Sequence, residues 1–119
     1  MENVIKRHTI SFKNAFIGLL WAYQTQPNYL IHLLLSILSI IGGYYWSISF
    51  VEWLVIIILI TLGFVIETIN TAIELTGDAI DKNYREDIGR AKDVSAAAML
   101  VYALGAFAAA VMIFAPKLF

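Results

Sequence analysis

Four polar residues at helical spacing form the part of this chain best suited to chemistry. They follow an apolar run that contains no charged residue after Glu52. Their spacing of three, four and four residues places them all on one stripe of a single helix. Carboxylates at the end of a segment apolar enough to span a membrane carry a free-energy cost. Their presence there therefore indicates a functional role. The residues of this polar stripe are Glu67, Asn70, Glu74 and Asp78.

The two glutamates of the polar stripe could serve two ends of one reaction. Glu67 and Glu74 lie about 10 Å apart along a helix axis, too far to bind one ion directly. One could act as a general base while the other binds a hard cation such as Mg²⁺, which prefers carboxylates together with phosphate oxygens and waters. Asn70 could orient a carboxylate or a substrate hydroxyl, or form a hydrogen bond between helices. Contact with lipid headgroups and basic partners alone is the simpler alternative that the spacing leaves open.

A second group of charged residues lies in segment 89–93, which reads Gly-Arg-Ala-Lys-Asp. Its cations could bind phosphate oxygens, or they could anchor a helix to anionic lipid. The chain has no Gly-rich Walker loop, no kinase HRD or DFG motif and no Ser/His/Asp arrangement. It has no cysteine, which excludes disulfides, thiol catalysis and thiolate metal sites. Any phosphate chemistry would therefore need a different kind of site.

The composition predicts a small membrane protein. With 119 residues the chain is long enough for one domain, which we expect to cover residues 1–119. Its residues are 61% hydrophobic and only 14% charged, so a soluble domain of this size could not bury its apolar surface. The net charge of -1 gives no indication of nucleic acid, and we expect no nucleic-acid partner. The N-terminus lacks a signal-peptide pattern, so we expect the first apolar span to remain in the mature protein.

We expect an all-α membrane protein with an N-terminal amphipathic surface helix and three transmembrane helices. The surface helix covers about residues 9–24, which are too few and too mixed to span a bilayer, and a packing helix of a bundle is its alternative. The spans cover about residues 29–46, 50–80 and 94–114. The second span includes the extension that carries the polar stripe. About 18 apolar residues suffice to cross a hydrocarbon core of about 30 Å.

Turn-forming and charged residues mark the connections between these helices. Pro27 breaks the apolar pattern before the first span, and the segment 47–49 forms a tight connection to the second. Residues 81–93 are expected to form a charged loop, and Pro116 is expected to end the last helix.

Basic residues predict which side of the membrane each connection faces. They precede the first span and lie between the second and third spans, whereas the link around Ser47 has none. The positive-inside rule therefore places the N-terminus and the polar stripe on the cytoplasmic side. A channel or transporter would more naturally carry polar groups near the membrane midplane. The basic residues assigned to the cytoplasmic side are Lys6, Arg7, Lys13, Lys82, Arg85, Arg90 and Lys92.

The polar stripe and the segment after it resemble the signature of a known family. Residues 67–74 read Glu-Thr-Ile-Asn-Thr-Ala-Ile-Glu, and Asp78 and segment 89–93 follow them. This pattern is similar to that of the small prokaryotic diacylglycerol kinases and undecaprenol kinases, and the resemblance covers nearly the whole chain. It implies a homotrimer in the bacterial cell (inner) membrane with active sites between protomers. It also implies that ATP and Mg²⁺ serve to phosphorylate a lipid alcohol at the cytoplasmic interface.

The resemblance also implies roles for individual residues. Glu67 corresponds to the catalytic base, Asn70 supports the polar stripe, and Glu74 is a ligand of both metal and nucleotide. Arg7 resembles an N-terminal arginine that contacts nucleotide and substrate, and the loop around Tyr84 corresponds to the segment that covers ATP. The residues implied to bind ATP are Arg7, Glu74, Asp78, Asn83, Tyr84, Arg85, Lys92 and Asp93.

One difference from the family pattern lies between the first two helices. The family has a stretch E-x-N-F-R-x-H, and its glutamate is the second acidic partner of the metal. Asn28, Tyr29 and His32 fit this stretch, whereas Gln26 replaces the glutamate and Leu30 the arginine. Glutamine offers Mg²⁺ a neutral carbonyl oxygen without the charge that attracts the cation. Weaker metal binding, altered nucleotide preference and lost activity are the outcomes that this change leaves open.

The expected substrate and the competing functions follow from the same residues. The stretch from Asn28 to His32 looks more like the undecaprenol kinases than the diacylglycerol-specific branch, so undecaprenol is the favoured lipid. The alternative is a catalytically impaired homologue that binds nucleotide or lipid without turnover, with Gln26 as its main support. A small channel or a structural membrane subunit is disfavoured, because the charged residues gather at one membrane boundary.

Overall fold

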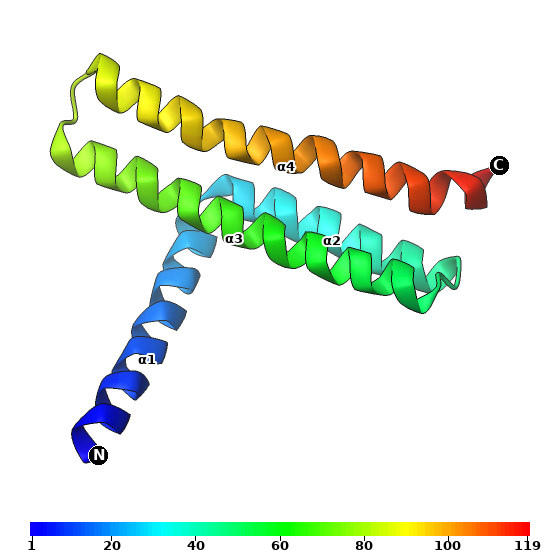
Figure 1. Cartoon of the computed structure of the whole chain (residues 1–119), viewed down its shortest axis with the longest axis horizontal. Helices are drawn as coiled ribbons and strands as arrows, with labels where there is room; N and C mark the ends of the chain where they lie inside the picture. The colour runs from blue at the N-terminus through cyan, green and yellow to red at the C-terminus, as the bar shows by residue number, and fades with distance from the viewer.

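The computed structural model describes residues 1–119 as four helices without strands. They are α1 (Glu2–Thr25), α2 (Pro27–Tyr45), α3 (Phe50–Ile80) and α4 (Glu86–Leu118). α2, α3 and α4 run side by side along the long axis, whereas α1 projects from them at a steep angle (Figure 1). These three helices are each long and apolar enough to cross a membrane. The expected all-helical membrane class is therefore confirmed.

α1 touches the bundle near its own C-terminal end, where Ala22 is buried (Figure 1). The helix begins at Glu2, earlier than the apolar pattern from about residue 9 predicts. The large apolar side chains of α1 are exposed, and Phe12 is 78% exposed. This exposure suits a helix that lies at a membrane surface. At Gln26 the backbone is extended and Pro27 takes the first position of α2, so the chain turns sharply there.

The connection between α2 and α3 is as tight as the sequence predicts. Ser47 adopts a positive φ of 49°, and Ser49 caps α3. The Ser49 hydroxyl accepts the backbone N–H of Glu52 at 3.2 Å, and the Glu52 carboxylate accepts the backbone N–H of Ser49 at 2.9 Å. This capping box satisfies two donors at the start of the helix. Gly43 permits the close approach of α2 to α3, because a Cβ there would lie 2.6 Å from the Trp53 ring.

The prediction of a charged loop over residues 81–93 is wrong, because helix α4 already begins at Glu86. Two acidic residues, Glu86 and Asp87, occupy its first turn, where the helix dipole favours negative charge. Glu86 also pairs with Arg90 one turn later at 3.1 Å. The charge density that indicated a loop therefore stabilises a helix start instead, and the loop is confined to residues 81–85.

The prediction that Pro116 ends the last helix is also wrong, since α4 continues to Leu118. Proline removes one hydrogen bond, but neighbouring donors satisfy carbonyls of the same turn. The backbone N–H of Phe119 donates to the Ala115 carbonyl at 3.2 Å. The Lys117 ammonium donates to the Ile113 carbonyl at 2.7 Å, so the last turn keeps its geometry.

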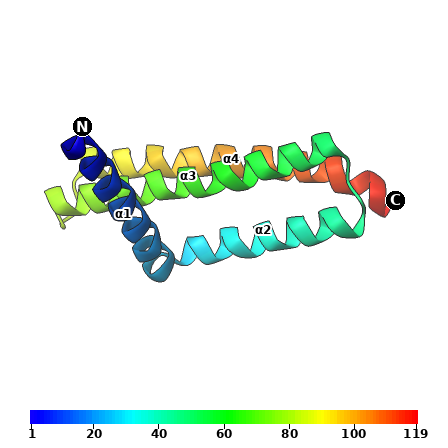
Figure 2. The same ribbon diagram turned by 90° about the horizontal axis from the view of Figure 1, so that it is seen from below.

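α3 is the central helix of the bundle, since it contacts both α2 and α4 (Figures 1 and 2). The closed apolar core is small and consists of Ile48, Ile56 and Ile113, close to the connection between α2 and α3. Most other large apolar side chains of the bundle point outward, among them Val101 at 71% and Met112 at 77% exposure. Outward apolar surface of this extent is the arrangement expected where lipid replaces water as the solvent.

Candidate functional site

Glu67 is buried between α3 and α2 and lacks a partner for one of its oxygens. The residue is only 2% exposed. Its Oε1 accepts a hydrogen bond from Nδ2 of Asn28 at 3.4 Å. Its Oε2 lies 3.8 Å from Nε2 of His32 and accepts no hydrogen bond. A carboxylate held in this way can accept a proton from a group that enters beside it.

The first turns of α2 bring these partners to Glu67. Asn28 and His32 are four residues apart, so they lie on the same face of the helix. Tyr29, which is 1% exposed, fixes this part of α2 to α3 through a hydrogen bond with the hydroxyl of Thr68. Its ring also packs against Phe64, with the centroids 5.9 Å apart. The start of α2 therefore positions the surroundings of the buried carboxylate.

Asn70 faces α4 and forms the hydrogen bond between helices that the sequence left as one of two options. Its Oδ1 accepts the hydroxyl of Ser95 at 2.7 Å, and both residues are buried. Thr71, the next residue, is 5% exposed, and its hydroxyl has no partner. Asn70 thus joins α3 to α4 and does not orient the carboxylate of Glu67 in this structure.

Asp78 and Lys92 form an ion pair between α3 and α4, whereas Glu74 is exposed and unpaired. The Lys92 ammonium lies 2.5 Å from Oδ1 of Asp78. Gly77 permits this approach, because a Cβ there would lie 3.0 Å from Cε of Lys92 and 3.0 Å from Cγ2 of Ile88. The structure therefore brings together one acidic and one basic residue of the expected nucleotide site and leaves the Glu74 carboxylate free.

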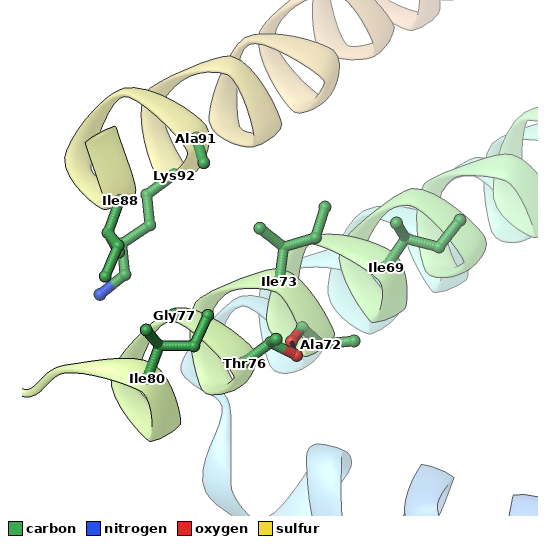
Figure 3. Close-up of a pocket in the computed structure, with 9 residues that line it drawn as sticks. All are labelled: Ile69, Ala72, Ile73, Thr76, Gly77, Ile80, Ile88, Ala91 and Lys92. Atoms are coloured by element: carbon green, nitrogen blue, oxygen red, sulfur yellow. Dashed lines mark hydrogen bonds between the residues drawn. The ribbon is translucent and has the colours of Figure 1, made fainter.

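A groove of about 330 Å³ lies between α3 and α4 beside this ion pair. Figure 3 shows Ile73, Gly77 and Ile80 along α3, facing Ile88 and Lys92 of α4. Its walls are mostly apolar, and Lys92 supplies its charged group. The groove on its own cannot neutralise the phosphates of a nucleotide, so other charged residues would have to contribute.

The loop residues expected at the nucleotide site lie at the α3–α4 connection. The backbone N–H of Asn83 donates to the Asp81 side chain at 2.9 Å. Tyr84 is 85% exposed, and its ring edge would lie 3.0 Å from a Cβ at Gly89. These positions leave the Tyr84 side chain open to a ligand.

Arg85 is engaged by its own neighbour. Its guanidinium donates to the carboxylate of Asp87 at 3.2 and 2.8 Å. This bidentate hydrogen bond holds the pKa of Asp87 below its usual value, and the backbone N–H of Ile88 acts in the same direction. Arg85 would have to exchange this partner for a phosphate in order to bind nucleotide.

The remaining expected residues are dispersed. Arg7 and Asp93 are exposed and form no ion pair. The Gln26 side chain donates to the Thr25 hydroxyl at 3.3 Å. The chain contains no group of three or more His, Cys, Asp or Glu side chains that could hold a metal ion. A single copy of the chain thus supplies separate parts of the expected site.

The predicted site residues did not include three polar partners that the structure places at the polar stripe. Asn28 and His32 lie beside Glu67, and Ser95 binds Asn70. The spacing of Asn28 and His32 is a signal that could have indicated the first contact, since both face the same way on α2. The contact of Ser95 depends on the register between α3 and α4, for which the sequence offers no comparable signal.

Together, the fold and the site define a helical membrane protein that holds a buried carboxylate of α3 beside the first turns of α2. Comparison with known sequences identifies the class more closely. The family model described as prokaryotic diacylglycerol kinase matches residues 13–114. The chain belongs to this family, which confirms the resemblance found in its motifs, and it is a lipid kinase.

Two relatives bear names that agree with this assignment. The undecaprenol kinase of Bacillus subtilis is 34% identical over 117 residues, covering 98% of this chain and 95% of the relative. The diacylglycerol kinase of Synechocystis sp. is 30% identical over 98 residues, covering 82% of this chain and 56% of the relative.

Proposed function

We propose that this protein transfers the γ-phosphate of ATP to the hydroxyl of a membrane lipid alcohol, with undecaprenol favoured over diacylglycerol. The observation that carries the proposal is the buried carboxylate of Glu67 with its unpaired oxygen. The similarity to an undecaprenol kinase over 98% of the chain supports the choice of lipid. The match of Asn28, Tyr29 and His32 to the undecaprenol kinase stretch supports it as well.

In this proposal Glu67 is the catalytic base. It accepts the proton of the lipid hydroxyl as the hydroxyl oxygen attacks the γ-phosphorus of ATP and ADP leaves. Phosphoryl transfer requires mainly positioning and neutralisation of charge, and a base that is shielded from water suits an acceptor dissolved in lipid. Lys92 and Arg7 supply positive charge to the phosphates, and Asn70 keeps α3 and α4 in register through Ser95.

The side chains proposed to hold Mg²⁺ have suitable chemistry. Glu74 presents an exposed carboxylate without an ion-pair partner, which is the hard oxygen ligand that Mg²⁺ prefers beside phosphate oxygens and waters. Gln26 would add a neutral carbonyl oxygen. When bound with ATP, the metal would neutralise charge on the phosphates. The residues proposed to contact the nucleotide itself are Arg7, Glu74, Asp78, Asn83, Tyr84, Arg85, Lys92 and Asp93.

We further propose that the site is completed between protomers of a homotrimer in the bacterial cell membrane. The exposed side chains of Arg7, Glu74 and Asp93, which form no ion pair within one chain, support a site that a neighbouring copy completes. The basic residues support an N-terminus in the cytoplasm, since the link around Ser47 carries none of them. This orientation gives ATP access to Glu74 and Lys92 from the cytoplasm.

The test is phosphorylation of undecaprenol and of diacylglycerol by the purified protein, with radiolabelled ATP and with Mg²⁺ varied. We expect faster transfer to undecaprenol, and a loss of about 100-fold or more in kcat for Glu67→Gln, as for removal of a general base. Glu86→Gln is the matched control, because this exposed glutamate contacts only Arg90. Near-normal turnover by a folded Glu67→Gln protein would exclude Glu67 as the base.

A catalytically impaired homologue that binds nucleotide or lipid without turnover is the second candidate, and Gln26 favours it. The two candidates differ in one measurement, the Mg²⁺-dependent consumption of ATP in the presence of lipid. Turnover by the unaltered chain supports the kinase, whereas turnover that appears only in Gln26→Glu supports the impaired homologue.

A further inference from the structure

His32 lies between the buried carboxylate of Glu67 and the interior of the bundle. A cavity of about 360 Å³ lies between α2, α3 and α4. His32, Ser36 and Tyr102 are among the residues that line it. The imidazole is 16% exposed, and its Nε2 lies 3.8 Å from Oε2 of Glu67. The ring therefore stands at the border between the site and an apolar cavity.

The His32 imidazole is held so that its Nε2 faces the Glu67 carboxylate. A Cβ at Gly63 would lie 3.1 Å from Nδ1 of His32 and 2.6 Å from Oη of Tyr102, so the glycine leaves room for both rings. The rings of Phe64 and Tyr102 flank the imidazole, with centroids 5.9 and 6.2 Å away. With Nδ1 against Gly63, Nε2 is the nitrogen available to Glu67.

The hydroxyls around this pair already have partners. Tyr102 of α4 donates to the Leu59 carbonyl at 2.5 Å, and the Tyr29 hydroxyl is paired with Thr68. The orphaned hydroxyl of Thr71 is one turn further along α3.

His32 is the only charged or titratable residue that forms an ion pair with Glu67. The Asn28 amide binds the other oxygen of Glu67, and none of the other ion pairs includes this carboxylate. No charged residue of α1 or α4 pairs with Glu67 or His32. His32 is thus the titratable side chain that the structure pairs with the buried carboxylate.

We propose that His32 is a positioning residue for Glu67, whose Oε2 accepts a hydrogen bond from its Nε2–H during turnover. This inference rests on the proposed role of Glu67 as the base. Hydrogen bonds of this type need about 2.7–3.2 Å, so a rotation of the carboxylate closes the gap. The bond uses one lone pair of Oε2 and holds the other lone pair where a lipid hydroxyl can reach it. An imidazole N–H can serve as this donor.

A histidine that only fills space would stabilise the packing beside Gly63 without affecting the protonation of Glu67. A donor to a carboxylate favours its ionised form, so its removal makes the carboxylate take up a proton at higher pH. Dicyclohexylcarbodiimide reports this difference directly, because it modifies carboxylic acids in their protonated form. The extent of labelling of Glu67 against pH, read by mass spectrometry, does not depend on kinase activity.

The experiment compares the full chain in lipid vesicles with His32→Leu, His32→Gln and Ser39→Ala. Leucine removes the donor, whereas glutamine carries an amide N–H close to the place of Nε2 and does not titrate. Ser39 lines the same cavity but bonds only to the Leu35 carbonyl of its own helix, so it serves as the control. His32→Met replaces the leucine variant if that protein does not fold.

For His32→Leu we expect the midpoint of labelling to move to higher pH and kcat to fall about tenfold or more, with the KM for ATP unchanged. His32→Gln and Ser39→Ala keep the midpoint and most of kcat. Equal midpoints in the wild type and His32→Leu would overturn the proposal, as would a His32→Gln protein as impaired as His32→Leu. A wild type without kinase activity would contradict the proposed function instead, and the labelling midpoints would still test His32.

Discussion

Asp78 and Lys92 join the end of α3 to the start of α4 by an ion pair of 2.5 Å. The side chains are 56% and 33% exposed, so the pair contributes little to stability, about 0–1 kcal/mol for exposed pairs in general. Its more important consequence is that the ammonium group is held at the border of the groove shown in Figure 3. A lysine fixed there can meet a phosphate with little further ordering.

Lys92→Met should therefore impair nucleotide binding more than folding. A hydrogen bond to a charged group is worth about 1.5–3 kcal/mol, so we expect the KM for ATP to rise about tenfold or more. The temperature of unfolding should remain close to that of the wild type. Arg90→Met is the matched control, since Arg90 lies in the same part of α4 and pairs only with Glu86. An equal rise in KM for both variants would mean that general positive charge, and not the position of Lys92, attracts ATP.

The buried pair of Ser95 and Asn70 should matter for stability. Ser95→Ala leaves the Asn70 oxygen without its 2.7 Å donor, and an unsatisfied buried group costs about 1–3 kcal/mol. We expect a lower unfolding temperature in detergent, measured by intrinsic fluorescence. Thr61→Ala removes an exposed hydroxyl that bonds only to Ile57 of its own helix, so it should leave the temperature unchanged. Equal stability of the two variants would show that water or lipid replaces the lost donor.

The fold could be predicted because the apolar runs are long and the turn residues are distinct. The boundaries at charged positions were harder to predict, as Glu86 shows. A dense run of charges is typical of a loop, yet acidic residues also suit the first turn of a helix. The sequence pattern alone does not distinguish a loop from a helix start at these residues, and the structure shows that α4 begins at Glu86.

The polar stripe could be predicted from spacing, but the partner of each residue could not. Glu67 and Asn70 are separated by about 60° around the helix axis. Because α3 lies between two neighbours, this difference turns Glu67 toward α2 and Asn70 toward α4. A shared stripe therefore does not imply a shared set of contacts, and only the packing of three helices separates a buried carboxylate from an amide that joins two helices.

The contact between Gly43 and Trp53 predicts a sharp difference between two glycines. A Cβ at Gly43 would lie 2.6 Å from the Trp53 ring, whereas a Cβ at Gly105 would meet nothing within 4 Å. Gly43→Ala should lower stability by about 1–3 kcal/mol, as overpacking does. Gly105→Ala should leave it equal or slightly higher, because alanine is the better helix former. Thermal unfolding of both variants in the same detergent provides the measurement, and equal losses would contradict the close packing of α2 on α3.

The last prediction concerns Gln26, at the sharp turn between α1 and α2. Its side chain is bound only to Thr25, at 3.3 Å, so a glutamate could take its place without loss of a buried contact. Gln26→Glu adds the carboxylate that the metal attracts most strongly, and we expect half-maximal activity at a Mg²⁺ concentration about tenfold lower.

Gln24→Glu adds the same charge to an exposed position of α1 and serves as the control. If both variants change the Mg²⁺ dependence equally, the effect is one of general charge at the membrane surface. If Gln26→Glu leaves the dependence unchanged while the wild type turns over, position 26 takes no part in holding the metal. A lower Mg²⁺ requirement in Gln26→Glu alone would place position 26 beside the proposed metal ligand Glu74 in the assembled site.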